Sequence, residues 1–107
     1  FKNLIIVSQE GATELSLKQL TPVRLLKNKF YEDIQVAQQQ NASTEDLREL
    51  LGSGRAKKGM FEGDLVEGEL EIGQISSAIN AIKPAATIVA EVWAEFNTTI
   101  QKLQSSF

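Results

Sequence analysis

Five carboxylates fall within ten residues and form the first group of side chains that could do chemistry; they are Glu62, Asp64, Glu67, Glu69 and Glu71. Calcium and magnesium prefer oxygen ligands of this kind. The spacing does not match the EF-hand pattern, however. A solvated acidic loop is therefore the preferred interpretation, and we predict no metal site.

Glycines and cations alternate between Gly52 and Gly59, in the order Gly-Ser-Gly-Arg-Ala-Lys-Lys-Gly. Backbone N–H groups of such a turn, together with a cation, can bind a phosphate. The Gly-Lys-[Ser/Thr] ending of a P-loop is missing, so this segment is not a P-loop. We prefer a helix C-cap at Gly52 followed by a basic surface turn.

A second basic group lies near Tyr31 and comprises Arg24, Lys27 and Lys29. These side chains could contact a nucleotide or an acidic carrier protein. Cations on the solvent face of an amphipathic helix are common, because their stems cover apolar surface while the charge stays in water. We therefore expect them to be solvated.

The composition excludes several classes of active site. The 107 residues include no cysteine and no histidine, which removes disulfides, thiol nucleophiles, Cys/His zinc sites and triads that need an imidazole. The net charge of −3 argues against nucleic acid as a partner. Apolar runs are too short to span a membrane and no signal peptide is visible, so we expect a cytoplasmic protein without membrane contact. The first residue, Phe1, is typical of a piece of a longer protein or of a processed chain.

The predicted elements begin with a short strand or turn region over residues 1–20, where an apolar run, Leu4–Val7, precedes an alternating segment, Glu14–Lys18. Thr21-Pro22 then predicts a helix start, because threonine caps and proline suits the first helical position. Apolar residues follow at three- and four-residue steps, and Asn41 is the predicted stop.

A second helix is predicted from Ser43 to Leu51, because Ser43 and Asp46 are spaced as in a capping box. Within a glycine-rich segment, 52–73, we predict a short helical turn over Arg55–Phe61 and an ordered loop over the remaining residues. A loop of this length in a compact domain usually has a functional role.

Two further helices are predicted near the C-terminus. Isoleucines and alanine from Ile75 to Ile82 give a helical stripe that Pro84 ends, and Pro84 opens a last amphipathic helix. The apolar face of that helix includes Trp93, Phe96 and Ile100. Such a stripe is more often core, although in a fragment it can be an exposed interface. The fold class is thus mainly α with a short N-terminal β segment, in a single piece over residues 1–107.

Three motifs, in this order, resemble a known family; they are Pro22-Val23-Arg24-Leu25-Leu26-Lys27-Asn28 (P-x-R-x-x-x-N), Gly63-Asp64-Leu65-Val66-Glu67-Gly68 (G-D-x-x-x-G) and Gly73-Gln74. The family is the flavin-dependent one that contains nitronate monooxygenase (2-nitropropane dioxygenase) and the FMN-type enoyl-acyl-carrier-protein (enoyl-ACP) reductase. The resemblance covers most of residues 12–82, and the last helix fits by position and pattern.

The resemblance implies a protein about three times as long, with a flavin-binding TIM barrel and a smaller helical lobe over its mouth. Active sites of such barrels lie at the C-terminal face. Residues 21–82, with the glycine-rich loop 52–73, would be the helical substrate lobe, and residues 83–107 the C-terminal amphipathic helix.

The resemblance also implies site residues, because in the family the loop before Gly-Gln approaches the flavin and the substrate. Gly73 and Gln74 are thus candidate cofactor-binding residues, and Glu71 and Ile72 are candidate walls of the substrate channel. Reductases of the family often carry methionine at the position of Glu71 and a small residue at that of Ile72. The family's catalytic histidine and phosphate-binding glycines belong to the barrel, so we expect no catalytic residue in this chain.

We therefore expect a C-terminal fragment of an FMN-dependent NAD(P)H oxidoreductase that forms lid and channel wall and is inactive alone. FMN and NAD(P)H would serve the full-length enzyme, and the fragment alone would bind no FMN. Its partner would be the missing N-terminal barrel, or a second copy in a homodimer. The alternative is an independent helical protein-interaction module without enzymatic activity, whose docking face is the aromatic stripe.

Overall fold

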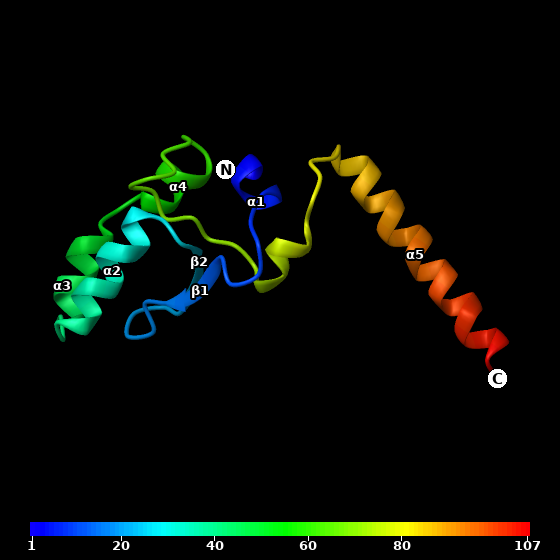
Figure 1. The fold of residues 1–107 in the computed structure, drawn as a ribbon, viewed down its shortest axis with the longest axis horizontal. Coiled ribbons are helices and arrows are strands. Elements are labelled where there is room, and N and C mark those ends of the chain that lie inside the picture. The colour runs from blue at the N-terminus through cyan, green and yellow to red at the C-terminus, as the bar shows by residue number, and fades with distance from the viewer.

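A computed structural model describes all of residues 1–107 and separates a lobe, residues 1–78, from one long helix (Figure 1). Its elements, in chain order, are α1 (Lys2–Ile6), β1 (Thr13–Ser16), β2 (Val23–Leu26), α2 (Lys29–Gln39), α3 (Thr44–Leu51), α4 (Arg55–Met60), the 3₁₀ helix η1 (Gln74–Ala78) and α5 (Ala85–Ser105). The prediction of a mainly helical fold with a small β segment is confirmed.

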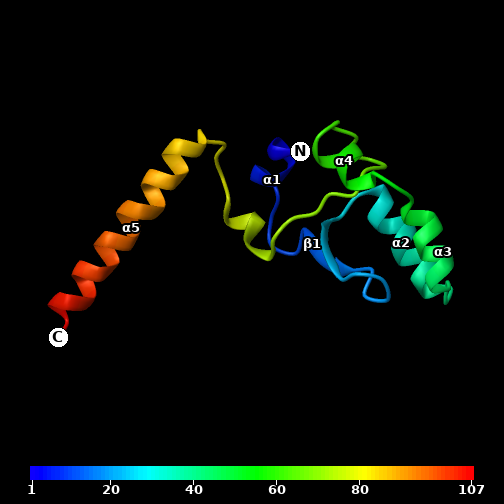
Figure 2. The same cartoon turned by 180° about the vertical axis from the view of Figure 1, so that it is seen from behind.

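The β segment is a hairpin in which β1 pairs antiparallel with β2, with Thr13 opposite Leu26. The predicted strand over Glu14–Lys18 is confirmed in its first half. The returning chain adds an extended segment to the other edge of β2: the Leu26 N–H donates to the Leu70 carbonyl (2.9 Å) and the Ile72 N–H donates to the Arg24 carbonyl (3.1 Å). Figure 2 shows the hairpin from behind.

The predicted helix start at Thr21-Pro22 is wrong, because residues 23–26 form β2. The helix α2 starts at Lys29 instead, and Asn28 caps it by accepting the Tyr31 N–H at 3.0 Å. Val23 and Leu26 fit a helical face in sequence, but pairing on both edges of β2 outweighs a local preference of this kind. The predicted stop at Asn41 agrees with the end of α2 at Gln39.

The apolar run Leu4–Val7 fits a short strand or the end of a helix in sequence, and in the structure it lies in α1 and its C-cap. Both edges of β2 are already paired, so a further strand here would have to pair with the outer edge of β1. The run instead buries Ile5 against Leu26 and Leu70. A helical turn forms backbone hydrogen bonds within itself, so the run requires no partner strand.

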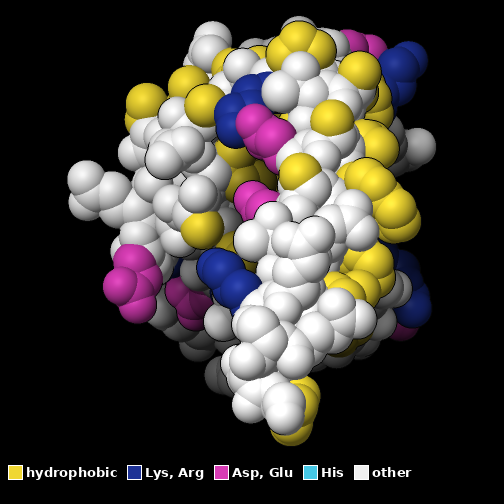
Figure 3. Space-filling model, turned by 90° about the vertical axis from the view of Figure 1, so that its right-hand side faces the viewer, with side chains coloured by type: hydrophobic (Ala, Val, Ile, Leu, Met, Phe, Trp, Pro, Cys, Tyr) yellow, Lys and Arg dark blue, Asp and Glu magenta, His cyan; other side chains and the backbone are white.

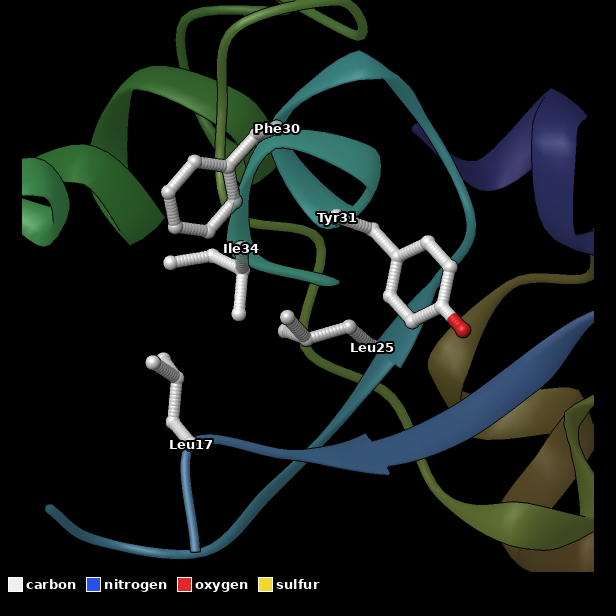
Figure 4. Packing of buried hydrophobic residues seen from close by; sticks show 5 residues of the cluster. All are labelled: Leu17, Leu25, Phe30, Tyr31 and Ile34. Carbon is white, nitrogen blue, oxygen red and sulfur yellow. The ribbon is translucent and has the colours of Figure 1, made fainter. Parts of the chain in front are cut away.

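Two apolar clusters hold the lobe together. The first contains Leu17, Leu25, Phe30, Tyr31 and Ile34 (Figure 4), and the second contains Ile5, Leu26 and Leu70. Leu25 and Leu26 are neighbours on β2, and successive side chains of a strand point to opposite faces. The strand therefore joins both clusters, one on each side.

The helix α3 has the predicted capping box. The Asp46 N–H donates to the Ser43 hydroxyl (3.1 Å), and the Ser43 N–H donates to the Asp46 carboxylate (3.2 Å). Gly52 ends the helix with a φ of 67°, a value that favours glycine. The short helical turn predicted after it is α4.

The helix predicted from Ile75 to Ile82 is only partly present. The 3₁₀ helix η1 ends at Ala78, and Ile79 is already extended with a ψ of 116°. Half of the Ile82 side chain is exposed. A stripe of about eight residues is too short to hold a helix without tertiary packing, whereas α5, whose apolar face is also uncovered, has 21 residues.

The last helix begins directly after Pro84, as predicted, but none of its residues is buried. Trp93 is 64% exposed and Phe96 52% exposed, so of the two interpretations of this stripe the exposed one, and not the core one, agrees with the structure. Figure 3 shows hydrophobic side chains in a row along one side of the molecule, beside the polar face of α5. No helix in the structure is both long enough and apolar enough to cross a membrane.

The chain is extended as a whole. Its radius of gyration is 18.0 Å, whereas a compact chain of this length has about 13 Å. It exposes 7597 Å², about 1,700 Å² more than expected for a compact protein of 11.8 kDa. The shape in Figure 1 explains this excess, because α5 stands apart from the lobe.

Candidate functional site

The glycine-rich loop is fixed to the start of α2 by one side chain, that of Asn28. Its amide group donates to the Leu65 carbonyl (3.0 Å) and to the Gly68 carbonyl (2.8 Å). The same side chain caps α2 through its oxygen. Asn28 thus satisfies a helix N-terminus and holds the far end of the loop at once.

A contact between Gly59 and Gly68 brings α4 and the loop together, backbone against backbone. A Cβ on Gly59 would lie 2.8 Å from the Glu69 carbonyl oxygen, and a Cβ on Gly68 would collide with the Gly59 Cα. Both positions exclude any side chain, which explains part of the glycine density in this segment.

Arg55 joins α3, α4 and the loop. Its guanidinium group donates to three carbonyl oxygens at 2.6–2.9 Å, those of Leu50, Leu51 and Glu67, and it lies 4.6 Å from the centroid of the Phe30 ring. An arginine held in this way has few donors left for a ligand.

The two lysines of the Gly52–Gly59 turn also have protein partners. Lys57 pairs with Glu62 (3.5 Å) and Lys58 with Asp64 (3.3 Å). The phosphate hypothesis for this turn therefore gains no support, and the interpretation as a C-cap and basic surface turn agrees with the geometry.

The carboxylates of the acidic segment do not converge. Asp64 accepts the Val66 N–H (3.1 Å) and the Glu67 N–H (2.9 Å), and these backbone bonds, that from Glu67 first, lower the pKa of Asp64. Glu67 pairs with Lys29 at 2.8 Å. No three acidic side chains are grouped as a metal site would require.

Glu69 differs from the other carboxylates because it is buried, with 7% of its surface exposed. Burial, and next the adjacent Glu71 carboxylate, raise the pKa of Glu69 to about 7, and Arg55 opposes them. A carboxyl group that takes up a proton near neutrality thus lies two residues before Glu71, the first candidate channel residue.

The four candidate site residues form the edge of the extended segment and the start of η1. Glu71 pairs with Leu25 at the edge of β2, and Ile72 follows it. Gly73 is exposed, and a Cβ there would meet no atom within 4 Å. Gln74 is exposed and lines a polar pocket of about 500 Å³. The structure thus places all four in one short accessible stretch.

The basic group near Tyr31 is divided among different partners. Lys27 lies 3.7 Å from Glu14, Lys29 pairs with Asp33 and Glu67, and the Tyr31 hydroxyl donates to Glu14. Burial first, then Glu14, raises the pKa of Tyr31 to about 12. The lysines are thus exposed cations with protein partners, and only Arg24 lines the polar pocket.

The chain resembles FabK from Thermotoga maritima. The similarity covers 98% of this chain at a TM-score of 0.83 and 28% identity, and a mutant of the same FabK matches with a TM-score of 0.75 and 27% identity. The chain spans about one third of the length of FabK. No protein-family model matches the sequence, and no curated protein matches it significantly.

The similarity to FabK extends over 98% of this chain, so the matched part takes in residues of all three motifs. Within this chain, two of them have a structural role: Asn28 clamps the loop, and Asp64 and Gly68 shape it. The third, Gly73-Gln74, is the accessible one.

Sequence reasoning missed the structural roles of three residues of this region. Asn28 could have been found as a cap, because asparagine is a preferred N-cap residue. The three carbonyl bonds of Arg55 and the burial of Ser76 depend on chain folding and left no local signal.

Proposed function

We propose that this chain is the C-terminal lobe and terminal helix of an FMN-dependent NAD(P)H oxidoreductase of the family that its sequence resembles. It would form a lid and a channel wall over the mouth of a flavin-binding TIM barrel and would supply no catalytic acid or base. The observation that carries the proposal is the match of the chain, over 98% of its residues, to one third of FabK.

The exposed surface supports this proposal independently. About 1,700 Å² of surface exceeds what a compact protein of this mass exposes. Large permanent interfaces bury areas of this order. The apolar residues of α5 recur with alternating four- and three-residue steps, which is the spacing of a helix that packs against another element; they are Val89, Trp93, Phe96, Ile100 and Leu103, and Phe107 follows one step beyond the helix. The missing N-terminal barrel of the same protein would cover them.

Gly73 and Gln74 would contact one edge of the flavin. The Gly73 backbone is open to close approach, and the exposed Gln74 amide can donate and accept hydrogen bonds. FMN, when bound in the whole enzyme, supplies hydride transfer from the nicotinamide. Glu71 and Ile72 would line the channel and exclude water beside it. This short edge cannot enclose FMN, so we expect the chain alone to bind none.

The match to FabK favours the enoyl-ACP reductase type over the nitronate monooxygenase type. An acyl chain attached to a carrier protein would then pass the channel wall at Glu71 and Ile72. A whole enzyme that reduces an enoyl thioester with NAD(P)H would support this choice, and one that oxidises only nitronates would reverse it.

The alternative function is an independent helical interaction module in the cytoplasm. The observation in its favour is the exposed aromatic stripe of α5, where the Trp93 and Phe96 rings stack with their centroids 5.5 Å apart. A homodimer through this face would be one form of such a module.

The length of the natural gene product separates the two functions. We expect the reading frame that encodes this chain to continue upstream of Phe1 for about twice its present length, given the share of FabK that it spans. The whole product should be yellow and oxidise NAD(P)H, and the 107-residue chain should be colourless. A natural product of 11.8 kDa would refute the proposal and favour the module.

The role of Gly73 is tested in the whole enzyme by Gly73→Ala. Since a Cβ there meets nothing in this chain, the variant should leave the lobe unchanged. If the flavin or substrate approaches this backbone closely, kcat/KM should fall about tenfold or more. Ser53→Ala, at an exposed position outside the candidate site, is the matched control. Equal values of kcat/KM for the two variants would show that Gly73 is not a residue of the site.

A further inference from the structure

The polar pocket beside η1 is formed by three segments that are distant in sequence: the turn 9–13, Arg24 on β2, and residues 74–77. Its volume of about 500 Å³ falls within the range of small-ligand sites. Such sites are mostly apolar, however, whereas Ala12 is the one hydrophobic residue here. The lining therefore suits a small charged ligand better than an apolar one.

Ser76 contributes a buried hydroxyl group that lacks a partner. The residue is 2% exposed, and its Oγ makes no hydrogen bond within the chain. The backbone of Ser76 is satisfied, because its N–H donates to the Gly73 carbonyl and its carbonyl accepts the Ile79 N–H. Since buried polar atoms are almost always paired, an orphan hydroxyl in a pocket wall points to a group that is bound there.

Arg24 contributes a guanidinium group that is weakly engaged. Its Nη1 lies 3.4 Å from the Thr13 carbonyl oxygen and 3.3 Å from the Thr13 hydroxyl. Both distances are longer than the usual value of about 2.9 Å. No carboxylate forms an ion pair with Arg24, although the exposed Glu10 also lines the pocket. Most of its five donors remain available.

We propose that this pocket binds an oxyanion, the phosphate or carboxylate group of a small ligand, between the Arg24 guanidinium and the Ser76 hydroxyl. Arginine suits planar, bidentate recognition of both groups. The exposed side chains of Gln74 and Ser77 add hydrogen-bond donors at the same pocket. The pocket shares Gln74 with the proposed flavin edge, but its two anion-binding groups, Arg24 and Ser76, lie outside that edge, so the proposal does not depend on the proposed function.

The test uses the 107-residue chain and two probes, inorganic phosphate and acetate, at constant ionic strength. Backbone amide NMR shifts are followed during each titration. We expect saturable shifts confined to residues 9–13, 24 and 74–77. Saturation by phosphate alone would identify a phosphate site, and saturation by both probes a general oxyanion site.

Arg24→Gln should weaken binding about tenfold to a hundredfold, because hydrogen bonds to charged groups contribute this much. Arg48→Gln is the matched control, since Arg48 lies exposed on α3 outside the pocket. It should leave the affinity unchanged.

Ser76→Ala provides a second variant in case Arg24→Gln does not fold. It should raise the thermal midpoint of the free chain, because it removes an unpaired buried group, and weaken binding about threefold to tenfold. Shifts with neither probe, shifts spread over all surface cations, or equal effects of Arg24→Gln and Arg48→Gln would each overturn the proposal.

Discussion

Replacing Glu69 by glutamine is expected to stabilise the lobe at neutral and alkaline pH. Burial, followed by the Glu71 charge, raises the pKa of Glu69 from 4.5 to about 7 in the folded chain. The folded state therefore holds this proton more tightly than the unfolded state does. Below pH 4.5 both states are protonated, and between 4.5 and about 7 the unfolded state ionises first, so the free energy of unfolding falls as the pH rises.

The size of the effect follows from the difference between the two pKa values of Glu69. This difference corresponds to a loss of at most about 3 kcal/mol in the free energy of unfolding. Water near the exposed Glu71 screens the charge, so we expect a loss of about 1 to 2 kcal/mol by pH 8. Glu69→Gln mimics the protonated form. Its stability should equal that of the native chain at pH 4 and exceed it by this amount at pH 8.

Urea unfolding from pH 4 to pH 8, followed by far-ultraviolet circular dichroism, measures this difference. Fluorescence is unsuitable, because the single tryptophan, Trp93, lies on α5 outside the lobe. Glu71→Gln should give a smaller gain, since it removes one charge and leaves Glu69 buried. Glu95→Gln, exposed on α5, is the control and should follow the native profile. Parallel pH profiles for Glu69→Gln and the native chain would refute the reasoning.

Three further outcomes follow from the packing. Asn28→Ala should lower the free energy of unfolding in urea by about 2 to 3 kcal/mol, because it removes a helix cap and two hydrogen bonds to loop carbonyls. Asn80→Ala, at an exposed position, is the control and should change little, and equal losses for the two variants would contradict the role of Asn28 in holding the loop. Gly68→Ala should lower the thermal midpoint by an amount equivalent to about 1 to 3 kcal/mol of stability, because the new Cβ would collide with Gly59. A midpoint equal to that of the native chain would show that the backbone contact can relax. Substituting alanine for Phe96 should leave lobe unfolding within about 0.5 kcal/mol of native; a larger loss would mean that α5 packs on the lobe.

The sequence alone predicted the elements whose signals are local. The capping box at Ser43, the helix C-cap at Gly52 and the start of α5 after Pro84 each depend on neighbouring residues, and each is confirmed. The resemblance in the motifs agrees with the similarity to FabK in its enoyl-ACP reductase part, and the similarity does not extend to nitronate monooxygenase.

The sequence failed where pairing over long distances decides the conformation. Residues 23–26 carry a helical apolar spacing, yet β1 on one edge and the 70–72 segment on the other make them a strand. The Ile75–Ile82 stripe stops after η1, because a helix this short needs a covering surface that is not present. Local preference is worth fractions of a kcal/mol per residue, and tertiary contacts outweigh it.

By itself, then, the sequence determined the residue types available, including the absence of histidine and cysteine, the caps that bound α3, and the apolar face of α5. Only the tertiary structure decided that this face is exposed, that Glu69 is buried, and that Arg24 and Ser76 line one pocket. The physical reason is that burial and proximity depend on which distant segments meet, and composition and spacing along the chain do not contain that information.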